Sequence, residues 1–172
     1  MRFLAINLYL VVLSLLLSVN GPLSAQEGIQ NSPAETVVKL YKDYAWEAVI
    51  EVPNPPSEPL LSSPPGVLRE YFDEPLVTLL LKDRTCGQGV CNLDFMPMWA
   101  SQDPAGTVVS IKTTENPTVV TVTLRQPDGG CVELTYYLKK TVKGWRISDV
   151  RNPKWSLVWI LSQPIDTDTA PR

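Results

Sequence analysis

Residues 118–142 read TVVTVTLRQPDGGCVELTYYLKKTV and carry the clearest strand signals in the chain. In its first part Val120, Val122 and Leu124 alternate with polar residues, a pattern typical of a half-buried strand. Its second part alternates in the same way, with Val132, Leu134, Tyr136 and Leu138 on one side and Glu133, Thr135, Tyr137 and Lys139 on the other. Pro127-Asp128-Gly129-Gly130 between them predicts a turn. The stretch therefore predicts an antiparallel hairpin with one buried face and one wet face.

The same signals continue on both sides of this hairpin. Val108 to Thr114 is rich in β-branched residues and predicts a preceding strand. Lys143-Gly144 predicts a second turn, which leads into Trp145-Arg146-Ile147. Trp155 to Leu161 is a short apolar segment that closes the domain. The second half of the chain is thus predicted to be an antiparallel meander.

Helices are predicted before the strands. Ser32-Pro33-Ala34-Glu35 is a capping box with proline at the first helical position. The apolar stripe that follows it at helical spacing consists of Val37, Tyr41, Tyr44, Ala45 and Ala48. A proline-rich connection follows, and a second helical region from about Val67 to Asp83 is predicted as two short helices that meet at Pro75.

Helices followed by an antiparallel meander are typical of an α+β fold, with the helices packed on one face of a curved sheet. Residues 32–162 are predicted to form this single domain, after a polar lead-in at residues 26–31. Residues 163–172 are predicted to be a disordered tail.

The first 25 residues have the features of a cleaved secretory signal peptide. Arg2 precedes an apolar stretch from Phe3 to Val19, and Leu23-Ser24-Ala25 offers a small residue for cleavage before Gln26. An uncleaved anchor is the alternative, but the stretch is short for a spanning helix and no basic residues follow it. We expect an exported protein of the periplasm or extracellular space, with no stable membrane span after cleavage.

Composition excludes several classes of function. The formal net charge is −3, and a mildly acidic domain without a basic cluster argues against nucleic acid and anionic lipid as partners. The chain contains no histidine, which excludes Ser-His-Asp and Cys-His nucleophilic systems. No cofactor is predicted.

Three cysteines allow one disulfide and leave one thiol. Cys86 and Cys91 enclose a short loop that would close as a disulfide in an oxidising compartment. Either these two pair with Cys131 buried, or Cys131 takes one of them, or all three stay reduced. Three sulfurs without a histidine do not complete the usual zinc site unless a carboxylate joins them, so no metal site is predicted.

The order of several motifs resembles a known family. A Tyr-x-x-Tyr stripe at Tyr41 and Tyr44 is followed by Tyr71-Phe72, and then by Leu93-Asp94-Phe95 with Gln102-Asp103. The last motif is Gly144-Trp145-Arg146-Ile147-Ser148-Asp149-Val150. Over roughly Ser32 to Ser162 this order resembles exported bacterial proteins of unknown function in the nuclear-transport-factor-2-like, or cystatin-like, superfamily.

The resemblance implies a strongly bent sheet wrapped around a long first helix, which leaves a cone-shaped pocket. Members of the family often carry Asp-x-Asp-Pro where this chain has Asp94-Phe95-Met96-Pro97, so the second carboxylate is missing here. The superfamily includes enzymes, binding modules and assembly domains, and the fold alone does not select among them.

Two functions follow as hypotheses. A small pocket enzyme, isomerase-, dehydratase- or hydrolase-like, would use Asp94 or Asp103 as general base and Tyr136 or Tyr41 as hydrogen-bond donor. The alternative use of both aspartates is to cap local turns. The interpretation we favour is a non-catalytic binding domain of the periplasm or cell envelope.

In the binding interpretation, the ligand is a small molecule or an envelope protein, and the chain is a monomer or a weak homodimer. The candidate binding residues are Trp99, Gln102, Tyr71 and Tyr136. Tyr137 on the wet face is a candidate mark of a partner surface. Structural roles are predicted for Trp145, Arg146 and Asp149, the last as a partner of Arg146 or Arg151 or as a tie for the closing segment.

Overall fold

The computed structural model describes residues 32–86 and 91–164, all of which belong to the compact unit Asn31–Arg172. The predicted signal at residues 1–25, the lead-in at 26–31 and residues 165–172 of the predicted tail lie outside the described residues. Gln163, the first residue of that tail, still accepts a hydrogen bond from the Asn92 side chain at 3.1 Å.

Helix α2 spans Pro33–Asp43 and begins with the predicted capping box. The Ser32 hydroxyl accepts from the Glu35 amide at 3.2 Å, and the Glu35 carboxylate accepts from the Ser32 amide at 2.6 Å. Leu40, which the expected stripe omitted, is fully buried beside Tyr41. The expectation of one helix through Ala48 is wrong, because α2 ends at Asp43 and the tighter 3-10 helix η1 follows at Ala45–Ala48.

Three further helical segments follow before the sheet. They are the 3-10 helix η2 at Leu60–Ser62, α3 at Pro65–Tyr71 and α4 at Glu74–Asp83. The break between α3 and α4 lies at Phe72 and Asp73, so the prediction of a break at Pro75 is wrong. Asp73 caps α4 by accepting from the Leu76 amide at 3.1 Å. Pro75 sits in the first turn, where its missing N–H is not needed.

The five strands form one antiparallel sheet in the order β1-β2-β3-β4-β5, and the sheet is not closed. Their bounds are β1 Val108–Thr113, β2 Val119–Arg125, β3 Cys131–Thr141, β4 Gly144–Asn152 and β5 Trp155–Ser156. Val122 lies opposite Leu134, and both are fully buried, which confirms the predicted alternation. The register of β3 with β4 shifts between Tyr137 and Leu138, which places Ser148 in a bulge.

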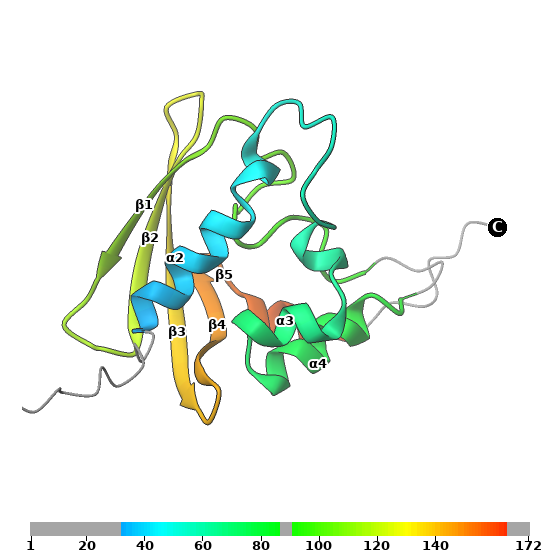
Figure 1. The fold of residues 1–172 in the computed structure, drawn as a ribbon, viewed down its shortest axis with the longest axis vertical. Coiled ribbons are helices and arrows are strands. Elements are labelled where there is room, and N and C mark those ends of the chain that lie inside the picture. Colours follow the sequence, from blue (N-terminus) through cyan, green and yellow to red (C-terminus); the bar gives the residue numbers. More distant parts are fainter. Residues whose placement is uncertain (1–31, 87–90, 165–172) are drawn as a thin grey trace, which may run out of the picture. The chain divides into compact units, whose positions relative to one another are not determined.

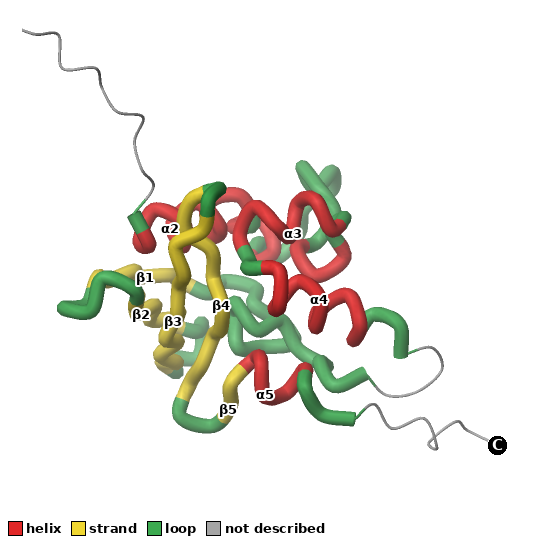
Figure 2. The backbone as a smooth tube through the Cα atoms, turned by 90° about the horizontal axis from the view of Figure 1, so that it is seen from below, coloured by secondary structure: helices red, strands yellow, loops and turns green. Residues whose placement is uncertain are grey.

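Helix α2 lies across one face of the sheet and contacts β1, β2 and β4 (Figure 1). Helices α3 and α4 lie beside β4, and the short helix α5 at Leu157–Leu161 packs against both α4 and β4 (Figure 2). The α+β class is therefore present, with helices before the meander. Within the described part of the chain, no helix is long and apolar enough to cross a membrane.

Candidate functional site

Two tyrosines predicted as hydrogen-bond donors meet in the interior, between α2 and β3. The Tyr41 hydroxyl donates to the Met98 carbonyl at 2.6 Å and lies 2.8 Å from the Tyr136 hydroxyl. Because the single Tyr41 proton is used by Met98, the Tyr136 hydroxyl is the donor to Tyr41. Burial raises the pKa of both phenols, and their mutual contact raises that of Tyr41 further. Both tyrosines therefore stay neutral at physiological pH.

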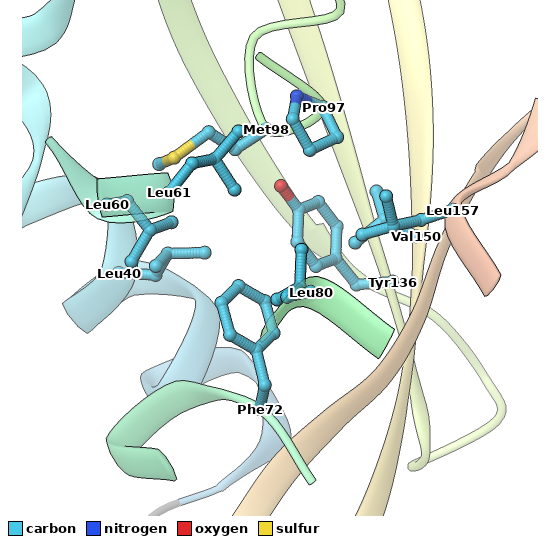
Figure 3. A pocket seen from close by; sticks show the side chains of 10 residues that line it. All are labelled: Leu40, Leu60, Leu61, Phe72, Leu80, Pro97, Met98, Tyr136, Val150 and Leu157. Atoms are coloured by element: carbon cyan, nitrogen blue, oxygen red, sulfur yellow. The ribbon is translucent and has the colours of Figure 1, made fainter. Parts of the chain in front are cut away.

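Tyr136 borders an enclosed apolar cavity between the helices and the sheet (Figure 3). Its lining consists of Leu40, Leu60, Leu61, Phe72, Leu80, Pro97, Met98, Tyr136, Val150 and Leu157. The cavity volume open to water-sized spheres is about 10 Å³, close to the minimum for a single water. Leu60 and Leu61 from η2 and Pro97 and Met98 from the following loop are among the side chains that line it. This space does not hold a ligand in the present conformation.

The two candidate aspartates lie elsewhere. Asp94 and Asp103 are exposed, and neither lines the cavity that Tyr136 borders. The Asp103 carboxylate accepts from the Ala105 amide at 3.1 Å, which is the turn-capping role weighed as the alternative. Gln102 donates to the Asp94 backbone carbonyl at 3.0 Å. Among the described residues, the predicted pairing of a carboxylate base with Tyr41 or Tyr136 is therefore absent.

Trp99, predicted as a binding residue, is a core residue. It is almost fully buried, meets Tyr41 edge to face with ring centroids 5.3 Å apart, and donates from its indole to Glu47 Oε2 at 2.8 Å. Glu47 Oε1 accepts from the Leu60 amide at 2.8 Å. Glu47 thus holds η1, η2 and Trp99 together. Sequence reasoning missed this role, because helical spacing places Glu47 away from the apolar stripe.

Tyr71, also predicted to bind, joins α2 to α3 instead. Its hydroxyl donates to Asp43 at 2.5 Å and accepts from Lys39 at 2.9 Å, while Lys39 also contacts Asp43 at 2.6 Å. Burial and the bond to Asp43 raise the pKa of Tyr71 to about 12. Burial acts to raise the pKa of Asp43, but hydrogen bonds from Lys39 and Tyr71 lower it on balance. The cluster is a polar clamp between two helices.

A roomy concave site with aromatic side chains lies on the other face of the sheet. We call it the outer groove. It consists of Tyr137 and Lys139 from β3, Ser148, Asp149 and Arg151 from β4, Ser156 from β5, and Val158, Trp159 and Ser162 in and after α5. Its volume is about 560 Å³, and it is open to solvent.

Asp149 is a buried residue of the groove that hydrogen-bonds to several of its other residues. This buried carboxylate accepts from the Val150 amide at 2.9 Å and the Val158 amide at 3.1 Å through Oδ1. Through Oδ2 it accepts from Arg151 Nε at 2.5 Å and Ser156 Oγ at 2.8 Å. Of the alternatives weighed for Asp149, these contacts correspond to a pair with Arg151, not Arg146, and to a tie to the closing segment through Ser156 and Val158.

The groove wall combines rings and cations. The Arg151 guanidinium lies 4.5 Å from the centre of the Tyr137 ring, and its bond to Asp149 raises its pKa. Trp159 is 62% exposed at the rim, and the exposed Lys139 contributes a second cation. Of this set, the sequence interpretation had marked Tyr137, Asp149 and Arg151. Alternation found Tyr137, whereas no local pattern predicts that Trp159 lines the same groove.

The other predicted structural residues have the following contacts. Arg146 donates to the backbone carbonyls of Arg69 and Trp145, each at 2.7 Å, and Trp145 packs against the core.

Of the three cysteines, Cys86 and Cys91 form the disulfide, as the first of the three alternatives has it. Cys131 is free but exposed, so its expected burial is wrong. It is the first residue of β3, opposite the exposed Arg125, and the alternation of the strand turns it to the wet face. The described residues contain no cluster of three or more possible metal ligands.

Comparisons with known proteins give little. No family model and no curated protein matches the chain. Among solved structures, it is similar to a phospholipid-binding protein from Ralstonia solanacearum, determined with a phospholipid, at 15% identity and a TM-score of 0.43. The similarity covers 74% of this chain and 82% of that one. At this level the likeness shows neither a shared family nor a shared ligand.

Proposed function

We propose that this chain is an exported, non-catalytic binding domain of the periplasm or cell envelope, and that the outer groove holds its ligand or partner. The observation that carries the proposal is the difference in volume between the two faces of the sheet. The interior cavity measures about 10 Å³, and the outer groove about 560 Å³. A site that binds a molecule larger than water has room in the outer groove and not in the cavity.

The chemistry of the groove favours binding over catalysis. Its carboxylate, Asp149, has both oxygens occupied by two hydrogen bonds each, so it is not available as a base. Tyr137 and Trp159 offer ring surfaces, while Arg151 and Lys139 offer hydrogen-bond donors. The serine hydroxyls donate to the Tyr137 carbonyl, Asp149 and the Val158 carbonyl, so they offer a ligand their acceptor lone pairs. Such a set holds a small polar molecule or an extended polar segment of a partner.

Membership in the nuclear-transport-factor-2-like superfamily, with a strongly bent cone-shaped sheet, is part of this proposal. Its support is the order of motifs in the sequence, together with α2 lying across an antiparallel meander. The filled interior is consistent with a member of that superfamily whose interior packs as a core and whose function lies on a different surface.

Export is tested by intact and tryptic mass spectrometry of the protein recovered from its native host, unreduced and then reduced. We expect a new N-terminus at Gln26 and a Cys86–Cys91 bridge, because disulfides persist in oxidising compartments. A retained Met1 with three free thiols would contradict export.

The groove is tested by two-dimensional NMR of the ¹⁵N-labelled protein. Benzoate, inorganic phosphate, choline, glucose and N-acetylglucosamine serve as probes of different charge and shape. We expect at least one probe to shift the Trp159 indole signal while the Trp99 indole, bonded to Glu47 in the core, stays in place. Trp159→Ala is expected to weaken that binding, with Asp103→Ala, an exposed substitution outside the groove, as the control. Shifts confined to Tyr41, Met98 and Tyr136 would place the site in the interior instead.

A further inference from the structure

Trp159 is the exposed aromatic residue of the outer groove, and the fold holds it in that position. Leu157 and Leu161, one helical turn apart in α5, are both buried, so a residue midway between them points to the opposite side of the helix. Asp149 anchors this helix by accepting from the Val158 amide at 3.1 Å. The Trp159 ring is thus presented to solvent, at 62% exposure, by an anchored segment. Such a ring suits a ligand that has an apolar face of its own.

Hydrogen-bonding groups around this ring remain available to a ligand. Arg151 uses its Nε for Asp149, and its two Nη groups form no hydrogen bond with any described residue. The Tyr137 hydroxyl and the Trp159 indole N–H also lack a hydrogen-bond partner in the part of the chain that the structure describes. Acceptor lone pairs come from three serine hydroxyls that donate their own protons within the fold, those of Ser148, Ser156 and Ser162. A ligand with several hydroxyls, each of which donates and accepts, matches this mixture.

The charges that line the groove are compensated. Arg151 Nε lies 2.5 Å from Asp149 Oδ2, and Lys139 Nζ lies 3.5 Å from Asp73 Oδ2. Both aspartates are buried, so each cation lies against a fixed carboxylate. Tight binding of an anion or a cation draws on an uncompensated opposite charge. The lining therefore favours a ligand without net charge.

We propose that the outer groove binds a neutral pyranose sugar, either free or as one residue of a glycan chain, an inference that rests on the proposed function of the groove. The apolar C–H face of the sugar would stack on the Trp159 ring, whose π face is electronegative. Sugar hydroxyls would accept from the Arg151 Nη groups and donate to the serine oxygens. A plain aromatic ligand would use the ring but not these polar groups, and phosphate would use the donors but not the ring.

The inference is tested by NMR titration of the ¹⁵N-labelled protein, with the Trp159 indole signal as the readout. The sugars are glucose, galactose, mannose, N-acetylglucosamine and the β-1,4-linked trimer of N-acetylglucosamine. The comparison ligands are benzoate, inorganic phosphate and glycerol, which has hydroxyls but no ring. We expect at least one sugar to bind about ten-fold more tightly than any comparison ligand, because only a sugar uses the ring and the polar groups together. Tighter binding of the trimer than of its monosaccharide identifies a glycan chain, and equal binding identifies a free sugar.

Salt separates a neutral ligand from an ionic one. Because the sugar has no charge, its dissociation constant is expected to change by less than about two-fold when the salt concentration rises from about 50 to about 500 mM. Binding of phosphate at an exposed site weakens over the same range, since ions screen the charges.

Two substitutions test the two halves of the site. Trp159→Ala is expected to weaken sugar binding about ten-fold, and Trp159→Phe, which keeps a ring, about three-fold or less. Arg151→Lys keeps the charge but loses the planar pair of Nη groups, so we expect binding to weaken about five-fold. The matched control is Arg125→Lys, the same exchange at an exposed position at the end of β2 outside the groove. It is expected to stay within about two-fold of the unchanged chain, and thermal unfolding establishes that each variant is folded.

Tighter binding of phosphate or benzoate than of every sugar would overturn the inference while leaving the groove as a binding site. Equal losses for Arg151→Lys and Arg125→Lys would also overturn it, as would sugar binding that weakens about ten-fold with salt. If none of these ligands moves the Trp159 signal, the proposed function of the groove fails, and this inference fails with it.

Discussion

Two neighbouring tyrosines of β3 lie in opposite environments, one in the core and one on the open face of the sheet. Tyr136 is fully buried, donates to Tyr41 and borders the 10 Å³ cavity. Tyr137, the next residue, stacks under Arg151 in the 560 Å³ outer groove. The same side chain thus serves the core on one face and an open surface on the other, because successive strand residues point to opposite faces.

This difference shows where the molecule has room to bind. On the inner face, the polar atoms of the tyrosine pair are used within the protein, and apolar side chains exclude solvent. On the outer face, Asp149 hydrogen-bonds to Arg151 and to the Val158 amide of α5, and aromatic and cationic side chains beside it face solvent. If the inner face is purely structural and the outer face is free for function, substitutions on the inner face will cost more stability than those on the outer face.

The largest effect is expected from truncating the inner tyrosine. Tyr136→Ala removes a buried ring and leaves a void next to an existing cavity, so we expect a loss of about 3–5 kcal/mol in the free energy of unfolding. Tyr137→Ala is expected to cost about 1 kcal/mol or less. Urea denaturation measures both, and equal costs for the two variants would show that the faces are not distinct.

The second effect concerns the support of the outer groove. Asp149→Ala leaves the Val158 amide and Ser156 hydroxyl without their acceptor, so we expect a loss of about 3 kcal/mol. Asp103→Ala, which removes one exposed turn contact, serves as the control at about 0.5 kcal/mol. Thermal unfolding compares them. If Asp149→Ala is as mild as the control, the carboxylate does not hold α5 in place.

A smaller effect separates the hydroxyl from the ring. Tyr136→Phe removes the donor to Tyr41 but leaves Tyr41 bonded to Met98, so we expect a cost of about 1 kcal/mol. Tyr137→Phe is expected to leave stability unchanged within about 0.5 kcal/mol. Chemical denaturation of the pair measures this, and a larger cost for Tyr137→Phe would reverse the assignment of the two faces.

The smallest effect is a pH dependence in the clamp between α2 and α3. Because the folded protein raises the pKa of Tyr71 to about 12, its contribution is fully present below pH 10 and is lost as pH rises toward 12. The stability difference between the unchanged chain and Tyr71→Phe should therefore shrink over that window. Urea midpoints at pH 8, 10 and 11 measure it. A constant difference would show that the Tyr71 proton is not shared with Asp43.

Local patterns predicted much of the fold. The capping box at Ser32 and Glu35, the alternation of β2 and β3, and the Cys86–Cys91 disulfide all depend on residues close in sequence, and the structure contains them. The end of α2 and the break before Pro75 were wrong by a few residues. The Asp73 cap bonds to the Leu76 amide three residues later, so it is a local signal that the interpretation missed, and the 3-10 helix η1 begins two residues after α2 ends.

The candidate site was predicted less well. Trp99, Tyr71 and Tyr136 were assigned to binding, yet Glu47, Asp43 and Tyr41 hold them within the fold. Each of these contacts joins segments distant along the chain or depends on how helices pack, and no spacing rule contains that information. Asp149 lies within β4, where its buried carboxylate needs hydrogen-bond donors, and Arg151, Ser156 and the Val158 amide supply them.

By itself, the sequence determined the α+β class, the order of helices and strands, which strand residues face inward, and the absence of histidine chemistry. These properties depend on backbone periodicity and composition, which are local. The filled interior, the groove that Tyr137 and Trp159 both line, and the smaller groove that Arg69, Lys143 and Arg146 share are set by the tertiary structure. Those outcomes depend on packing volumes and on contacts between distant segments, which form only when the chain has folded.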